Sequence, residues 1–178
     1  MRWKSSDDRY GAVAIAIHWT TAAAIVGILA SGFQAADAME AADRLALLRI
    51  HATLGIFVVL LTLMRIGWWW LGDAKPADAA GTPRWQARAA HIVHGLLYVI
   101  ILGMGASGIG MLALSGAGAT LFAGATTPLP DFTTYLPRAP HGLGSRLLIA
   151  LLAFHTAAAL YHHFVMRDGL LGRMGLGR

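Results

Sequence analysis

Four long apolar segments, separated by polar connections, dominate the pattern along the chain. They run from about residues 12 to 33, 45 to 71, 89 to 114 and 140 to 166. A helix needs about 20 apolar residues to cross a hydrocarbon core of about 30 Å, and each segment is long enough. The pattern therefore predicts an all-α membrane protein, in which residues 1–178 form a single domain built on a four-transmembrane-helix bundle.

The composition agrees with this class and narrows the chemistry. Hydrophobic residues make up 57% of the chain and charged residues 13%, whereas soluble domains carry about 25% charged residues. The chain has no cysteine, which excludes disulfides, iron–sulfur clusters and haem attached covalently through C-x-x-C-H. The net charge of +5 is spread over connections and ends. It therefore reports membrane topology, and no nucleic-acid partner is expected.

The basic residues predict the orientation, since four spans put both termini on one side. Nine of them lie in the N-terminal segment, the second connection and the tail: Arg2, Lys4, Arg9, Lys75, Arg84, Arg88, Arg167, Arg173 and Arg178. The first and third connections, together with the helix starts that follow them, hold Arg44, Arg49, Arg138 and Arg146. Because cytoplasmic loops carry the excess of positive charge, we expect both termini to be cytoplasmic.

The last apolar segment and its start carry four histidines, at positions 141, 155, 162 and 163. Fourteen residues separate His141 from His155, which in a helix is a rise of about 21 Å and a rotation of about 40° from a common line. The two rings should therefore lie on nearly one face, one toward each side of the membrane. Ionisable side chains inside a membrane helix are costly, and they indicate functional sites.

With the predicted topology, four histidines sort into two pairs. His51 and His141 lie toward the outer side, and His18 and His155 lie toward the inner side. Each pair draws on two different segments, as a haem between facing helices requires, with one imidazole on each face of the iron. We therefore expect a bundle that encloses two haem b groups, held non-covalently and suited to passing one electron at a time.

Three alternative roles for the histidines place different requirements on the chain. Histidines that only bond neighbouring helices would make the chain a non-catalytic interaction protein, but four at matched depths on three segments disfavour this. A zinc or copper site needs three or four ligands in one place, whereas the predicted pairs lie about 20 Å apart. A histidine-lined proton or metal transporter is disfavoured because the four apolar segments contain no Asp or Glu.

Arg65 follows His51 by fourteen residues, so it lies near the level of the inner pair. One interpretation is that its guanidinium binds a haem propionate in a bidentate manner. The other is that it extends to the membrane interface beside the tryptophans at positions 68–70. The sequence alone leaves both interpretations open.

Further histidines gather at the inner side. His162 lies seven residues after His155 on nearly the same face, and histidine titrates near neutral pH. We expect it to supply protons to a quinone there. His91 and His94 are either alternative ligands of the inner haem or neighbours of it, and His163 is expected at the surface.

Four motifs then carry a resemblance: IAIHW at 15–19, RIHATLGI at 49–56, HIVHGLLY at 91–98 and HTAAALYHHFVMRDGLLGRM at 155–174. With these, the whole chain resembles the bacterial cytochrome b561 family, short di-haem four-helix proteins related to the cytochrome b subunits of hydrogenases and formate dehydrogenases. The resemblance implies the bacterial inner membrane, His18 with His155 on the inner haem, and His51 with His141 on the outer haem. It also implies electron exchange with the quinone pool, because some members are superoxide oxidases that oxidise periplasmic superoxide and reduce ubiquinone.

Two versions of this function remain open. One is a self-contained quinone-linked oxidoreductase of the superoxide-oxidase kind, which the shortness of the chain favours. The other is a membrane cytochrome b that anchors a soluble redox protein. The outer connection, residues 115–140, is rich in Gly and Pro rather than in charge, which leaves the outer electron donor open.

Overall fold

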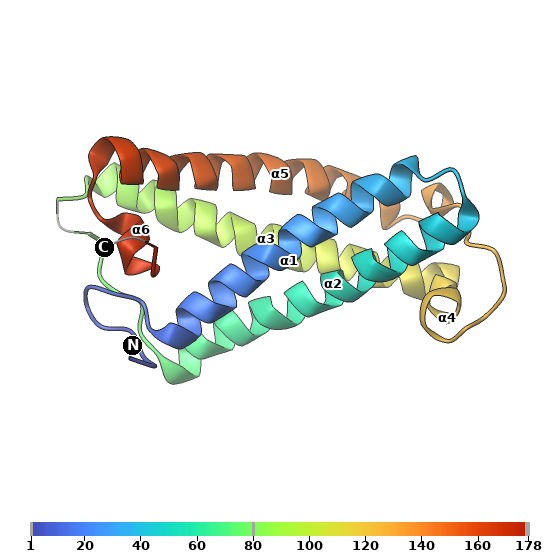
Figure 1. Ribbon diagram of the computed structural model, residues 1–178, viewed down its shortest axis with the longest axis horizontal. Helices are drawn as coiled ribbons and strands as arrows, with labels where there is room; N and C mark the ends of the chain where they lie inside the picture. Colours follow the sequence, from blue (N-terminus) through green and yellow to red (C-terminus); the bar gives the residue numbers. More distant parts are fainter. Residues whose placement is uncertain (1, 80, 177–178) are drawn as a thin grey trace.

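A computed structural model describes residues 2–79 and 81–176. Its four long helices are α1 (Ala12–Asp37), α2 (Ala41–Gly67), α3 (Arg84–Ser115) and α5 (Arg138–Tyr161) (Figure 1). Helix α2 continues into a π-helical turn, η1 (Trp68–Gly72), and α5 into another, η3 (His162–Met166). With these turns, the four candidate spans are 26, 32, 32 and 29 residues long, and all are apolar enough to cross a membrane. The all-α, four-helix membrane architecture is confirmed.

The helices differ from their predicted bounds mainly at polar ends, where the hydrophobic pattern carries no signal. Helix α3 begins at Arg84, directly after Pro83, because proline suits the start of a helix. The N-cap of α2 is Glu40, while Asp43 lies within the first turn. Short elements fill the remaining connections: α4 (Ala117–Phe122), η2 (Phe132–Thr134) and α6 (Leu170–Arg173).

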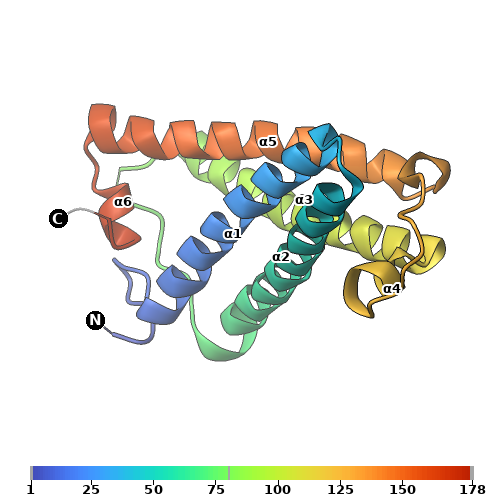
Figure 2. The same cartoon turned by 45° about the vertical axis from the view of Figure 1, so that its right-hand side comes forward.

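The bundle consists of two helical hairpins. Helix α1 packs along α2, α3 packs along α5, and the hairpins meet mainly between α2 and α3 (Figure 2). Both termini lie at the same end of the bundle, and α4 lies at the opposite end (Figure 1). Following the predicted topology, we refer to the end with the termini as the inner end.

The side chains are arranged for a lipid surrounding. Only a small core is buried, centred on Ala24, Ile25 and Val58. Large apolar side chains elsewhere on the helices are open to the outside, such as Val26 at 68% and Phe154 at 60% exposure. In water this surface would be a liability, whereas in a bilayer it faces hydrocarbon, and close helix packing is left to small side chains.

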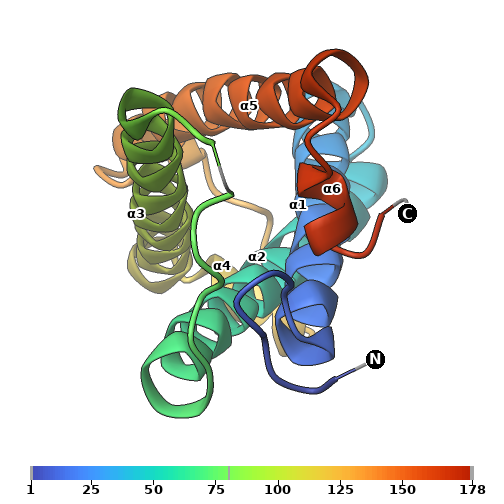
Figure 3. The ribbon, with the colours of Figure 1, turned by 90° about the vertical axis from the view of Figure 1, so that its left-hand side faces the viewer.

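Three segments lie at the inner end, and we call them the terminal cap: residues 2–10, residues 73–79 and the segment around α6 up to residue 176 (Figure 3). Arg173 joins all three, because its Nε donates to the Asp8 carbonyl at 2.8 Å and its Nη2 to the Ala77 carbonyl at 2.5 Å. The Ser5 hydroxyl donates to the Asp73 carboxylate at 2.7 Å. The cap thus ties the two ends of the described chain to the connection between the hairpins.

Asp73 is the charged anchor of this cap. Partial burial by itself raises its pKa, but hydrogen bonds from Ser5, from the Ala74 amide and from the Trp68 indole outweigh that effect. The pKa of Asp73 therefore lies below its usual range, and the carboxylate stays ionised near neutral pH.

Candidate functional site

The histidines that the sequence paired face one another at two levels of the bundle. His51 of α2 and His141 of α5 have ring centroids 6.1 Å apart, with ring planes at 65°. His18 of α1 and His155 of α5 have centroids 6.3 Å apart, with planes at 68°. Each pair takes one ring from each hairpin, and α5 contributes to both pairs.

The outer pair is oriented by hydrogen bonds to its Nδ1 atoms. Nδ1 of His51 lies 3.0 Å from the carbonyl of Ile28, to which it donates. The Ser107 hydroxyl donates to the Met104 carbonyl at 2.9 Å, so it accepts from Nδ1 of His141 at 3.0 Å. A neutral imidazole that donates from Nδ1 keeps a free lone pair on Nε2. Both outer rings are therefore prepared to bind a metal through Nε2, in the way that most metal-bound histidines are supported.

A glycine makes room for one of these rings. A Cβ added at Gly32 of α1 would lie 3.0 Å from Cε1 and Nδ1 of His51. Atoms this close repel, since optimal carbon contacts are about 3.5–4.0 Å. The His51 ring therefore occupies the space that a side chain at position 32 would need.

The inner pair has a guanidinium beside it. Nη1 of Arg65 donates to Nδ1 of His18 at 2.9 Å, so Arg65 turns into the bundle rather than toward the membrane interface. His94 is also adjacent, with its ring centroid 5.3 Å from that of His155. His91 instead lies at the surface, where its side chain is 68% exposed and its Nε2 is 3.4 Å from Asp78.

His162 is held from two sides below the inner pair. Its Nδ1 contacts the Asp168 carboxylate, and its Nε2 lies 2.7 Å from the amide nitrogen of Gln86, which donates to it. The backbone after η3 turns Asp168 back toward the ring, since Arg167 and Gly169 on either side have left-handed φ values of 51° and 75°. The side chain of His162 is 13% exposed, so the ring points into the protein.

Asp168 is ionised in this arrangement. Its partial burial raises the pKa, but the hydrogen bonds from His162 and from the Leu170 amide lower it by more. The pKa of Asp168 consequently lies below its usual range, and a carboxylate faces the imidazole near neutral pH. A carboxylate that accepts from Nδ1 fixes the orientation and the tautomer of the His162 ring.

Sequence reasoning missed Gln86, Asp168 and Ser107. Gln86 falls in a stretch that the pattern assigned to a loop, because the first turn of α3 is polar. Asp168 lies within the motif at 155–174, and its RDG sequence is a turn signal that could have placed it near His162. His163, by contrast, meets its neighbour Phe164 edge-to-face, with ring centroids 4.7 Å apart.

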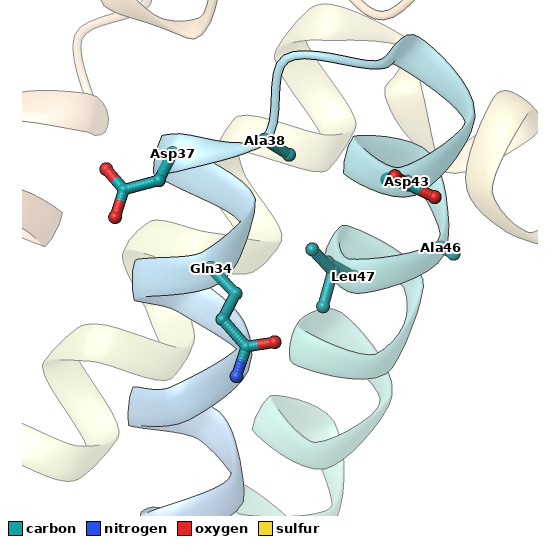
Figure 4. Close-up of a pocket in the computed structure, with 6 residues that line it drawn as sticks. All are labelled: Gln34, Asp37, Ala38, Asp43, Ala46 and Leu47. Carbon is teal, nitrogen blue, oxygen red and sulfur yellow. The ribbon is translucent and has the colours of Figure 1, made fainter.

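The histidine pairs are separate from a hollow in the surface at the outer end of the bundle. That hollow, of about 550 Å³, lies between the outer ends of α1 and α2 and holds no histidine (Figure 4). Its lining residues are Gln34, Asp37, Ala38, Asp43, Ala46 and Leu47. Within residues 2–79 and 81–176, no group of three or more His, Cys, Asp or Glu side chains is close enough to hold a metal ion.

Comparison with known proteins agrees with this architecture. The family model for prokaryotic cytochrome b561 matches residues 9–177. Cytochrome b561 homolog 1 of Escherichia coli is 28% identical over 70% of this chain and 72% of its own length. Cytochrome b562 of Cereibacter sphaeroides is 29% identical over 93% of this chain and 94% of its own. A protein of Yersinia pestis named "Probable superoxide oxidase CybB" is 24% identical over 93% and 95%, respectively. The chain therefore belongs to the prokaryotic cytochrome b561 family, whose members transfer electrons in the bacterial inner membrane.

Proposed function

We propose that the chain holds two haem b groups, an inner one between His18 and His155 and an outer one between His51 and His141. The observation that carries this is the separation of the rings, 6.3 and 6.1 Å between centroids. A metal-bound imidazole nitrogen lies about 2 Å from the metal and its ring centre about 1 Å further, so opposed rings have centres about 6 Å apart. His94 is closer to His155, at 5.3 Å, so it is proposed as a neighbour of the inner haem.

The surrounding residues hold these groups in different ways. The Ile28 carbonyl and the Ser107 hydroxyl hold the outer rings through Nδ1, so His51 and His141 would bind the outer haem through Nε2. At the inner site, Arg65 supplies a cation for a haem propionate. When bound, haem b supplies reversible one-electron chemistry, and two axial histidines suit it to electron transfer.

We further propose that ubiquinone is reduced at the inner end, beside His162. Reduction of a quinone takes two electrons and two protons, so the site needs a proton donor. The Asp168 carboxylate holds the His162 ring through Nδ1, and Nε2, which faces Gln86, is the atom that would donate a proton to a quinone oxygen. Asp168 itself is at the aqueous edge, with its side chain 28% exposed, where it can help to restore the proton.

The proposed outer donor is superoxide. Two superoxide anions each release one electron and become dioxygen, and the two electrons reduce one ubiquinone together with two protons. The support is the Yersinia pestis relative, of which 95% is covered. The second candidate is a membrane cytochrome b that serves a soluble redox partner, which the relatives named only as cytochromes b561 and b562 favour.

A pyridine haemochrome assay on the purified, fully loaded protein tests the first proposal, with two haem b per chain as the expected result. One haem or none per chain would refute it. A source of superoxide, added to vesicles that contain the protein and ubiquinone, tests the second. Quinone reduction without any soluble protein supports the superoxide assignment, whereas reduction only after addition of a soluble cytochrome supports the anchor.

A further inference from the structure

Two buried nitrogens, one in the last turn of α2 and one in η1, have no hydrogen-bond acceptor among the described residues. Among the residues that the structure describes, Nε of Arg65 and Nε1 of Trp69 are the buried side-chain nitrogens without a hydrogen-bond partner. They are four residues apart, so they lie on about the same side of the helix. Buried N–H groups in proteins are nearly always bonded. Two such donors about one helical turn apart therefore indicate an acceptor that the described chain does not supply.

The positive charge around these donors indicates that the missing acceptor is an anion. Within the described residues, no carboxylate lies within ion-pair distance of Arg65, since the ion pairs there involve only His91 and His162. Asp73 is engaged by Ser5 and by the Trp68 indole. A second cation is near, because Nζ of Lys75 lies 5.9 Å from the centre of the Trp69 ring. A partly buried guanidinium without a counter-ion is costly.

Coordination chemistry strengthens this point for Arg65. In the structure, Arg65 donates to Nδ1 of His18. A neutral histidine that binds iron through Nε2 carries its proton on Nδ1, and it can then no longer accept from a guanidinium. With iron bound, Arg65 must release His18, and both its Nη1 and its Nε then need an acceptor.

The three consecutive tryptophans have distinct roles. The Trp68 indole donates to Asp73 at 3.2 Å, and Trp70 is 83% exposed. Trp69 is turned inward and fixed, because Tyr10 meets its ring edge-on at 6.0 Å and Lys75 lies over its face. The π-helical turn that begins at Trp68 is a feature often found at functional sites.

We propose that Trp69 and Arg65 together bind a propionate carboxylate of the inner haem, with the indole N–H and the guanidinium as donors. Trp69 is thereby a cofactor-binding residue and not a member of an interfacial aromatic belt. The inference rests on the proposed inner haem. The competing occupant of the same donors is a lipid phosphate, which the experiment below separates from the haem carboxylate.

The test compares Trp69→Phe, which removes the N–H and keeps an aromatic ring, with the matched control Trp70→Phe. Transfer of haem from the detergent-solubilised protein to apomyoglobin is followed for each haem, and the inner haem is identified as the spectral component absent from His18→Ala. Trp69→Phe should release the inner haem about tenfold faster, as expected for a lost hydrogen bond to a charged acceptor. Release of the outer haem should be unchanged, and Trp70→Phe should behave like the wild type.

Reconstitution with haem dimethyl ester, whose propionates carry no charge, completes a thermodynamic cycle. The wild type should release the ester faster than haem, and the difference between wild type and Trp69→Phe should shrink toward zero. Equal rates of inner-haem release from Trp69→Phe and Trp70→Phe would overturn the inference. It would also be overturned if Trp69→Phe accelerated release of the ester as much as release of haem, which is the result expected if the donors bind a lipid phosphate. If the wild type holds no haem between His18 and His155, the proposed function itself fails, and the haemochrome assay detects that outcome separately.

Discussion

Gly32→Ala is a minimal perturbation of the outer site, because it adds one methyl group beside His51. The new Cβ would lie 3.0 Å from Cε1 and Nδ1 of the ring, against an optimal contact of about 3.5–4.0 Å, so the ring must move by about 0.5 Å. Such a shift stretches the 3.0 Å bond from Nδ1 to the Ile28 carbonyl to the limit of a useful hydrogen bond. Loss of such an orienting partner lowers metal affinity about 10–100-fold. We expect the outer haem to be held more weakly by that factor.

The assay is a titration of haem into the apoprotein in detergent, followed by a reduced-minus-oxidised spectrum that resolves the two haems. Gly103→Ala on α3 is the matched control, since a Cβ there meets nothing within 4 Å. Both substitutions improve helix propensity by up to about 1 kcal/mol, so helix stability does not separate them. If Gly32→Ala binds the outer haem as tightly as Gly103→Ala does, the missing side chain at position 32 is not what keeps His51 in place.

Three further predictions concern the ligands, the proton path and the terminal cap. His51→Ala should remove only the outer spectral component and His18→Ala only the inner one, and loss of the same component in both variants would contradict the pairing. Asp168→Asn should slow reoxidation of the reduced protein by a ubiquinone analogue about tenfold or more, as His162→Ala should, while both haem spectra stay intact. Stopped-flow rates equal to those of the wild type would exclude proton donation through His162 and Asp168. Because the folded-state pKa of Asp73 is depressed, its contribution to cap stability is present above the unfolded pKa of about 3.9 and is lost as pH falls through the folded value. Limited proteolysis of the N-terminal segment in detergent should therefore accelerate in that acidic range, and an acceleration on the alkaline side would contradict the sign.

The hydrophobic pattern was sufficient to predict the four membrane-spanning helices, because a bilayer requires about the same minimum apolar length of every helix that crosses it. For the histidines, depth follows from helix rise once the topology is predicted, so the sequence could also indicate which rings lie at the same level. His51 and His141 could be matched in this way although 90 residues separate them, and their rings meet at 6.1 Å.

The hydrogen-bond partners of the site side chains could not be predicted from the hydrophobic pattern. The acceptor for His51 is the backbone carbonyl of Ile28. Every residue has such a carbonyl, so the sequence does not indicate which one is used. Gln86 was hidden in a polar helix start, and the inward turn of Trp69 is indistinguishable in sequence from the neighbouring Trp68 and Trp70. Such contacts depend on the rotation of each helix about its axis. A membrane helix is apolar on most of its faces, so the pattern of apolar residues determines this rotation only loosely.

The division of the bundle into two hairpins has a consequence for biogenesis. The first hairpin emerges from the ribosome with His18 and His51 already in place, but neither has an opposing ring until α5 is inserted. Each haem would then bridge the two hairpins as a cross-link, and haem supply would control their final association. Because α5 carries one ring of each facing pair, a rotation of this one helix would move one ring at both levels of the bundle together.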